Sequence, residues 1–380
     1  MNQLHHFSFP TAITFGCGAR HEAATHLLFV GAQRPLIVTD RAVADLRITI
    51  DFDRNLRARG LRPGIFAGVR GNPTAGQVAA GKAAFREHQA DCVIGLGGGA
   101  ALDVAKAVAL MAVHEGEILD FAWGNPKRRG VERPLPYWIA LPTTSGTGAE
   151  VGRSAIISDD RSHVKEVVFS PALMARAVFA DPEFTADLPP AITAATGIDA
   201  LTHNIESYLS PSYHPICDGI ALEGVRLAAR ALPAAFKDGS DLAARNDMMM
   251  ASMMGAIAFQ KDLGAVHSCA HALSAVLDLH HGLANGVMLD YVMRFNTDAA
   301  RLKLGELARV SGAGSSADDF VAWLTRLKNE LGIPAHLGEV GGTTRHLRQL
   351  VDIAFKDSCH KTNPRPCTVN DFEQIFSEAL

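Results

Sequence analysis

The chain has 380 residues, of which 48% are hydrophobic and 20% are charged, and its formal net charge is -4 with the histidines neutral. This length allows two domains with a large core, and the composition excludes a disordered chain. The slightly acidic balance argues against a nucleic-acid-binding protein, which should present a basic face.

No apolar run reaches the roughly 20 residues that span a bilayer. The first residues, MNQLHHFSFPTAITFG, lack the basic start and apolar segment of a secretion signal. The six cysteines show no CxxC spacing, so free thiols are a better prediction than disulfides. We therefore expect a cytoplasmic protein without a membrane partner.

The first half of the sequence alternates short β-branched runs with helical stretches. This order predicts an α/β domain over residues 1–183, with a Rossmann-like parallel sheet and helices on both of its faces. Ligands of such sheets bind beyond the carboxyl ends of the strands. The predicted strands are Ala12–Phe15, Pro35–Asp40, Gly64–Val69, Cys92–Leu96 and Tyr137–Leu141, and the predicted helices are Ala19–Phe29, Leu46–Arg59, Ala75–His88 and Ala101–Val113.

A glycine run, Gly97–Gly99, follows the fourth predicted strand and opens a helix. Backbone N–H groups there can approach a phosphate closely, and the helix N-terminus favours an anion. Gly95, Gly97 and Ala100 also match G-x-G-x-x-A, but outside the usual context of that fingerprint, which is the first strand. A tight strand-to-helix turn without a ligand is the alternative interpretation.

Two further strand ends carry polar side chains. Asp40 ends a buried strand, where a carboxylate can accept hydrogen bonds from a ribose diol and repel a 2′-phosphate, although it could equally cap the next helix. The segment Thr143–Thr147 offers small hydroxyls that could donate hydrogen bonds to phosphate or ribose, with a plain loop as the alternative. Together the three strand ends predict a dinucleotide cleft.

After Ala180–Pro182 the pattern changes to helices alone, which predicts an all-α domain over residues 184–380. The active-site cleft would then lie between the two domains. The predicted helices are Pro190–Tyr208, Pro215–Phe236, Leu242–Phe259, Val266–Leu279, Ala284–Phe295, Ala299–Val310, Ala317–Leu331, Arg345–Ala354 and Val369–Ala379.

This helical half contains potential metal ligands at helical spacing. Asp199 and His203 are four residues apart, as are His267 and His271, which places both members of each pair on one helix face. His281 follows, ahead of a glycine where a helix could stop. A carboxylate and several imidazoles from separate helices are the ingredients of a divalent metal site. Chance pairing among 16 histidines is the alternative, although unpartnered Asp or His is costly in helices this apolar.

These motifs resemble the iron-containing (group III) alcohol dehydrogenases, a family that includes lactaldehyde reductase and 1,3-propanediol dehydrogenase. The resemblance runs nearly end to end and implies a dehydroquinate synthase-like architecture. The matching segments are Phe7 to Ala19, Asn72-Pro73-Thr74, Gly97-Gly98-Gly99 with Asp103 and Lys106, Leu141 to Glu150, Ala195 to His203, His267 to Gly282, and Thr362 to Arg365.

By this resemblance the metal ligands would be Asp199, His203, His267 and His281, and the ion Fe²⁺, with Zn²⁺ or another divalent metal as a substitute. His271 matches a family histidine that lies near the nicotinamide and is not usually a primary ligand. We therefore expect His271, Asp199 and His267 to carry the catalytic chemistry. The proton could leave through His271, whose ordinary pKa suits that role, or through a ribose hydroxyl and water.

The resemblance also implies NAD as the cofactor, and Asp40 would favour it over NADP. Ala100 replaces a family serine and Gly71 a family proline, but the metal ligands are intact, which argues against the metal-free maleylacetate reductase branch. The expected cofactor-binding residues are Asp40, Asn72, Gly97, Gly98, Gly99, Asp103, Thr143, Thr144 and Thr147.

We therefore expect a metal-dependent, NAD(H)-linked alcohol dehydrogenase or aldehyde reductase that acts on a small primary alcohol or aldehyde, as a homodimer or larger homo-oligomer. Phe259 and Cys359 map near the family's substrate pocket, and a basic residue such as Lys261 could select an acidic substrate. The alternative is a dehydroquinate synthase-like lyase or cyclase, whose pocket should be rich in Lys and Arg. A nucleotide-binding protein without catalysis is a third possibility, which the absence of bindable metal would favour.

Overall fold

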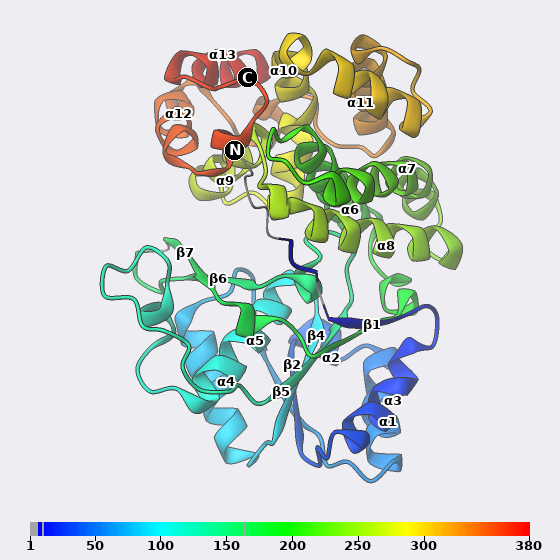
Figure 1. Ribbon diagram of the computed structural model, residues 1–380, viewed down its shortest axis with the longest axis vertical. Helices are drawn as coiled ribbons and strands as arrows, with labels where there is room; N and C mark the ends of the chain where they lie inside the picture. The colour runs from blue at the N-terminus through cyan, green and yellow to red at the C-terminus, as the bar shows by residue number, and fades with distance from the viewer. Residues whose placement is uncertain (1–6, 10, 163) are drawn as a thin grey trace, which may run out of the picture. The chain divides into compact units, whose positions relative to one another are not determined.

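The computed structural model describes residues 7–9, 11–162 and 164–380 (Figure 1). These residues form two compact units. The sheet unit comprises residues 9–144 and 149–185, and the helical unit comprises residues 186–380 together with Phe7, Ser8 and the short segment Ser145–Gly148. Among the described residues, no helix is both long enough and apolar enough to cross a membrane.

The sheet unit is built on a six-stranded parallel sheet with the order β1-β8-β5-β4-β2-β3. Its central strands are buried runs, such as PLIVTD and CVIGLG, because helices cover both faces of a parallel sheet. The strands are β1 (Ala12–Phe15), β2 (Pro35–Asp40), β3 (Gly64–Val69), β4 (Cys92–Gly97), β5 (Tyr137–Pro142) and β8 (Ala177–Ala180).

Helices pack on both faces of this sheet, as predicted (Figure 1). Successive strand residues point to opposite faces, and on β4 Ile94 joins Leu27 and Leu56 in one core. Its neighbour Gly95 faces the other way, where a Cβ would lie 2.9 Å from the Cβ of Ala105. The helices are α1 (Glu22–Phe29), α2 (Arg41–Ala44), α3 (Arg47–Ala58), α4 (Ala75–Glu87) and α5 (Gly99–Val113).

The strand order reverses between β2 and β4. From β2 the chain moves outward to β3, and then returns to the other side of β2 as β4 before reaching β5. A reversal of this kind opens a crevice beyond the carboxyl ends of the strands. Asp40 ends β2 and Gly97 ends β4, so two of the predicted nucleotide-binding positions lie at this crevice.

Three strands were not predicted from the sequence. β8 lies between β1 and β5 and completes the sheet, while β6 (Ser154–Ser158) and β7 (Lys165–Phe169) form a separate antiparallel pair. β8 is a four-residue apolar run that is buried throughout, so its sequence shows no alternation of apolar and polar residues. In β7, two adjacent charged residues followed by three apolar ones break the alternation.

The helical unit packs its helices around one continuous core. α6 is buried along most of its length, and its small residues allow close packing: a Cβ at Gly197 would lie 2.2 Å from a Leu232 methyl carbon. The helices are α6 (Pro190–Leu209), α7 (Pro215–Lys237), α8 (Leu242–Ala258), α9 (Ala265–Leu277), α10 (His281–Ser311), α11 (Ala317–Glu330), α12 (Leu347–Lys356) and α13 (Val369–Ala379).

α10 differs from its prediction. The sequence predicted two helices, Ala284–Phe295 and Ala299–Val310, but the structure has one helix that is interrupted only by a non-helical backbone at Ala300, with φ -120° and ψ 19°.

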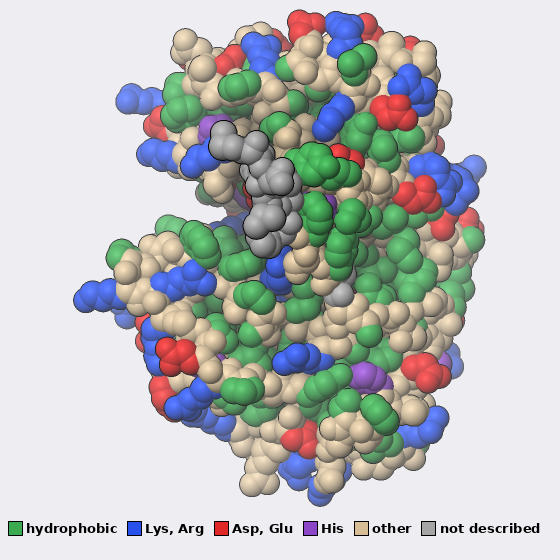
Figure 2. Space-filling view, viewed as in Figure 1, with side chains coloured by type: hydrophobic (Ala, Val, Ile, Leu, Met, Phe, Trp, Pro, Cys, Tyr) green, Lys and Arg blue, Asp and Glu red, His purple; other side chains and the backbone are tan. Residues whose placement is uncertain are grey.

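On the surface, Lys and Arg side chains are interspersed with Asp and Glu on the face shown in Figure 2.

Candidate functional site

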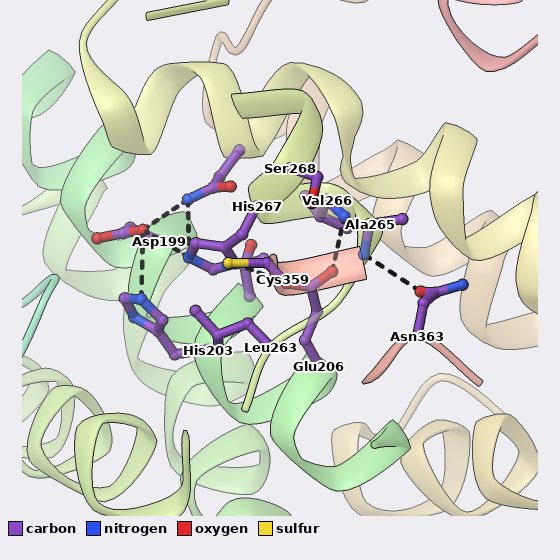
Figure 3. Close-up of polar contacts among 12 residues, drawn as sticks. Asp199, His203, Glu206, Leu263, Ala265, Val266, His267, Ser268, Cys359 and Asn363 are labelled. Carbon is purple, nitrogen blue, oxygen red and sulfur yellow. Dashed lines mark hydrogen bonds and ion pairs between the residues drawn. The ribbon is translucent and has the colours of Figure 1, made fainter. Parts of the chain in front are cut away.

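The four predicted metal ligands come from three helices of the helical unit. α6 carries Asp199 and His203 one turn apart, and α9 carries His267 (Figure 3). His281 is the first residue of α10. One ligand atom from each of these four side chains lies within 4.8 Å of the other three. We call this group the Asp/His cluster.

Asp199 lies at the centre of the Asp/His cluster. Its Oδ1 lies 4.0 Å from Nε2 of His203 and 3.9 Å from Nε2 of His267. Nε2 of His281 is 3.5 Å from the same oxygen. Ligand atoms bound at about 2.0–2.2 Å from a common ion lie roughly 3–4 Å apart, so the spacing fits a single cation.

Burial favours the neutral form of two of the imidazoles, those of His203 and His267. It lowers the pKa of His267 well below its ordinary value, and the neighbouring histidines lower it further. Burial also lowers the pKa of His203, although the carboxylate of Asp199 opposes the shift. Neutral imidazoles offer the lone pairs that metals require. One carboxylate with neutral imidazoles is a donor set that suits Fe²⁺ or Zn²⁺.

The end of α9 and the start of α10 correct one expectation. A helix does not stop at the glycine after His281: α9 ends at Leu277, and α10 begins at His281. Gly282 is therefore in the first turn of α10. A Cβ at Gly282 would lie 2.1 Å from the carbonyl oxygen of Ala195, so glycine is needed for α10 to approach α6 closely enough to place His281 near Asp199.

Two polar residues that the sequence analysis did not identify support the Asp/His cluster. Oε2 of Glu206 accepts a hydrogen bond from Nδ1 of His267 at 2.6 Å, and its Oε1 accepts from the Val266 N–H at 2.7 Å (Figure 3). Nδ2 of Asn285 donates to Oδ1 of Asp199 at 2.7 Å. These bonds orient the ligands, as hydrogen bonds to metal ligands commonly do.

Helical spacing was the signal that could have identified both residues. Glu206 lies seven residues after Asp199 and three after His203, so all three share one face of α6. Asn285 lies four residues after His281 on α10. Polar residues at these positions in otherwise apolar helices indicate partners for the ligands.

His271 lies outside the Asp/His cluster but beside it. Its ring stacks on that of His281, with centroids 5.3 Å apart. Its Nδ1 lies 2.8 Å from Oδ2 of Asp357, and these two residues form a second group of ligand-type atoms with Cys359. Burial raises the pKa of Asp357, but hydrogen bonds from His271, Cys359 and Ser268 outweigh it and hold that pKa below its ordinary value.

The residues expected near the substrate have distinct surroundings. The Phe259 ring lies 5.3 Å from the His203 ring. Burial raises the pKa of the Cys359 thiol well above its ordinary value, so this thiol stays protonated, and all six cysteines are free thiols, as predicted. The suggestion that Lys261 could select an acidic substrate is wrong, because Lys261 is buried in an ion pair with Asp218.

In the sheet unit, a cavity of about 330 Å³ lies at the crevice beyond β2 and β4. Of the predicted cofactor-binding residues, Asp40 and Gly98 line it. The remaining lining residues lie at the carboxyl ends of β2, β3 and β4 and at the starts of α2 and α5, and are Arg41, Ala42, Val69, Arg70, Gly71, Ala100 and Ala101.

The turn from β4 into α5 is shaped for an anion. Gly97 has φ 150°, and a Cβ there would lie 2.6 Å from the Cβ of Ala101. Gly98 is the N-cap of α5 and Gly99 its first residue, and no side chain caps this helix end. The N–H groups of the first turn therefore remain available to a phosphate. The hydroxyl of Thr144 faces Gly98, 3.2 Å from the position of a Cβ.

Asp40 caps a helix and also lies at the crevice. Its Oδ1 accepts the Val43 N–H at 2.8 Å and so caps α2. Its Oδ2 lies 3.8 Å from the position that a Cβ on Gly97 would occupy. One carboxylate oxygen is thus used in the helix cap, while the other lies at the crevice.

The other predicted cofactor residues do not line this cavity. Asn72 is exposed in the turn before α4, and Thr143 is buried, with its N–H bound to Gly97. Asp103 bonds to Lys106 and to the Ile156 N–H, which ties α5 to β6. Thr147 is exposed and belongs to the helical unit, not to the sheet unit.

Comparison with known proteins covers both units. The model of the family "Iron-containing alcohol dehydrogenase" matches residues 10–182, and that of the "Fe-containing alcohol dehydrogenase family, C-terminal" matches residues 193–380. The chain is 38% identical over 364 residues to the 4-hydroxybutyrate dehydrogenase of Cupriavidus necator, which covers 92% of this chain and 93% of that protein.

Two further proteins are similar to this chain over nearly its whole length. The NAD-dependent methanol dehydrogenase of Bacillus methanolicus is 34% identical over 385 residues, covering 99% of this chain and all of that protein. A crystal structure of 1,3-propanediol oxidoreductase matches with a TM-score of 0.94 and 33% identity, over 100% of both chains.

The fold and these relatives define the class of protein as an alcohol dehydrogenase, in which an α/β unit is joined to a helical unit. Within that class, the chain belongs to the iron-containing alcohol dehydrogenase family. The predicted family and fold are confirmed, and the dehydroquinate synthase-like lyase is not favoured.

Proposed function

We propose that this protein is a metal-dependent, NAD-linked dehydrogenase that interconverts a small primary alcohol and its aldehyde. The observation that carries the proposal is the Asp/His cluster, whose four ligand atoms converge within 4.8 Å. Its donor set suits Fe²⁺, with Zn²⁺ as a substitute. The uncapped N-terminus of α5 and the carboxylate of Asp40 at the crevice support NAD, as does the relative named an NAD-dependent dehydrogenase.

The cation, the cofactor and the side chains around them would have separate roles in this reaction. When bound, the cation supplies Lewis-acid polarisation of the substrate oxygen, and the nicotinamide supplies the hydride acceptor. Asp199 is the one carboxylate among the four ligands and leaves a divalent ion with net positive charge. Glu206 orients His267 through their 2.6 Å hydrogen bond.

Oxidation of an alcohol removes a hydride from the carbon and a proton from the hydroxyl. We assign the proton to His271, directly or through one water molecule. Its Nδ1 is bound to Asp357, so Nε2 is the ring nitrogen that remains for the hydroxyl. The fully protonated thiol of Cys359 is not suited to this role.

The substrate is proposed to be small and uncharged at the reacting end. The 4-hydroxybutyrate and methanol dehydrogenases to which the chain is similar are named for small primary alcohols. Phe259 beside His203 offers an apolar ring, and Lys261 is neutralised by Asp218.

We also propose a homodimer or larger homo-oligomer, which light scattering would measure.

The test combines metal analysis with turnover. The protein is stripped by a chelator, reloaded with Fe²⁺ or Zn²⁺, and assayed for NADH oxidation with a panel of short aldehydes. We expect bound metal and metal-dependent net NADH consumption, and an Asp199→Asn variant should lose both. Metal-independent turnover, or no bindable metal, would contradict the proposal, and transient oxidation without net NADH loss would favour the lyase.

A further inference from the structure

The carboxylate of Asp357 is hydrogen-bonded through both oxygens. Its Oδ2 lies 2.8 Å from Nδ1 of His271. Its Oδ1 accepts the Ser268 hydroxyl and the Cys359 N–H, each at 2.8 Å. Ser268 is itself fixed, because its Oγ accepts the His360 N–H at 2.9 Å. Three donors therefore hold this carboxylate in one orientation.

A carboxylate fixed in this way selects one tautomer of its imidazole partner. An ionised carboxylate only accepts hydrogen bonds, so Nδ1 of His271 must carry the hydrogen. In the neutral imidazole, Nε2 then carries the lone pair. Within the described part of the chain, no hydrogen bond to Nε2 is formed, so this lone pair is available to a ligand.

The ring of His271 is also held in place by its neighbours. It stacks on His281 with an interplanar angle of 22° and meets His267 edge-on at 71°. Both neighbours belong to the Asp/His cluster, so the ring of His271 lies beside the proposed ion site. The bond to Asp357 opposes a flip of the ring about χ2, which would turn a ring carbon toward the carboxylate in place of Nδ1.

We infer that Asp357 is a positioning residue that holds His271 as the Nδ1–H tautomer, with Nε2 ready to accept the substrate proton, and that Ser268 and the Cys359 N–H hold Asp357. The inference rests on the proposed function. In the step it serves, the hydroxyl O–H bond breaks and an N–H bond forms at Nε2. The nicotinamide, when bound, would supply the acceptor for the hydride that the carbon loses. The hydrogen on Nδ1 stays in its bond to Asp357.

Kinetics provide the first test. We expect Asp357→Asn to lower kcat for alcohol oxidation by about 10–100-fold, as loss of such supporting hydrogen bonds commonly does, with KM and metal content nearly unchanged. Ser268→Ala should have a smaller effect in the same direction. Asp352→Asn, at an exposed position on α12, is the matched control and should match the wild type.

The tautomer itself provides the second test. The Zn²⁺-loaded protein is labelled with ¹⁵N-histidine, and the His271 signals are assigned by their loss in His271→Ala. The wild type should show Nδ1 protonated and Nε2 unprotonated, and Asp357→Asn should show a mixture. A wild-type Nε2–H tautomer, or an Asp357→Asn protein with unchanged kcat and tautomer, would overturn the inference. A wild type without dehydrogenase activity would contradict the proposed function instead, while the tautomer would still decide whether Asp357 positions His271.

Discussion

Two imidazoles on α9 are each backed by a carboxylate. Glu206 accepts from Nδ1 of His267, and Asp357 accepts from Nδ1 of His271. In both pairs the bond leaves Nε2 for chemistry, but the neighbours differ: Nε2 of His267 lies near Asp199, whereas His271 stacks on His281. The same local device can thus serve a metal ligand and a proton acceptor.

Replacing Glu206 tests the first of these pairs. We expect Glu206→Ala to weaken Zn²⁺ binding by about 10–100-fold, because His267 loses the partner that sets its orientation. Competition with a chromophoric chelator measures the affinity. Glu223→Ala on α7, where the side chain is 43% exposed, is the control. Equal affinities for the wild type and Glu206→Ala would show that the hydrogen bond does not support the ligand.

Gly282 tests the close approach of α10 to α6. A Cβ there would lie 2.1 Å from the Ala195 carbonyl oxygen, so we expect Gly282→Ala to lower the free energy of unfolding by about 1–3 kcal/mol and to reduce metal binding. Urea denaturation measures the first effect. Gly219→Ala is the control, because among the described residues no atom beyond its own stretch of helix lies within 4 Å of its Cβ position, and it should be neutral or stabilising. A fully stable, metal-binding Gly282→Ala protein is the contrary result.

Glu150 should make stability depend on pH. Burial raises its pKa from 4.5 to about 7, so between these values the folded state binds more protons than the unfolded state. Stability is therefore lost as pH rises through this window. Between pH 5 and 8, the free energy of unfolding of the wild type should fall by about 2–3 kcal/mol more than that of Glu150→Gln. Urea denaturation at each pH measures both values.

The exposed Glu87 on α4 is the control for this prediction. Glu87→Gln and the wild type should have stabilities that change in parallel with pH. If Glu150→Gln also follows the wild type across the whole range, the carboxyl of Glu150 titrates alike in the folded and unfolded states.

Elements with strong local signals were predicted well from the sequence. The runs of β2 and β3 and the helix α13 have the predicted bounds, because β-branched residues or a helical period are bounded by turn residues. β8 lacks such a signal because its four residues are all apolar and buried, and its place beside β5 depends on a pairing distant along the chain. The sequence placed Asp199, His203 and His267 on helices, but it left His281 between two predicted helices. The start of α10 at His281 depends on packing against Ala195, which no local pattern reveals.

The turn between β4 and α5 can be tested by a substitution at Gly97 that should weaken NADH binding. Gly97→Ala forces a Cβ to within 2.6 Å of the Ala101 Cβ at φ 150°, which must displace the first turn of α5. We expect NADH to bind at least about tenfold more weakly, since the phosphate-binding N–H groups move. Fluorescence titration measures the dissociation constant.

Gly130 offers the control for that substitution. Its Cβ position meets only ordinary contacts, the nearest at 3.7 Å, so Gly130→Ala should bind NADH as the wild type does. Unchanged binding by Gly97→Ala would mean that this turn does not hold the cofactor.

At the scale of the whole molecule, metal removal should affect one unit selectively. All four residues of the Asp/His cluster belong to the helical unit, and a ligand at 100 times its Kd stabilises the folded state by about 2.7 kcal/mol. After chelation we expect faster hydrogen exchange in α6 and α9, with β4 unchanged. The contrary results are a uniform loss of hydrogen-exchange protection across both units and no change in protection in either unit. Each would show that no ion holds these helices together.

The chain leaves the sheet unit after Thr144, returns at Ala149 and leaves again after Thr185. The intervening segment Ser145–Gly148 packs in the helical unit, where the Ser252 hydroxyl donates to the Gly146 carbonyl at 3.0 Å and Gly148 fits against Ala256. Neither unit is therefore encoded by one continuous stretch of gene. A single recombination crossover near codon 185 would replace residues 186–380 with those of a relative but keep the original Ser145–Gly148. That tetrapeptide would then pack against a helical unit with which it does not match. We therefore expect the two parts of the gene to be inherited together.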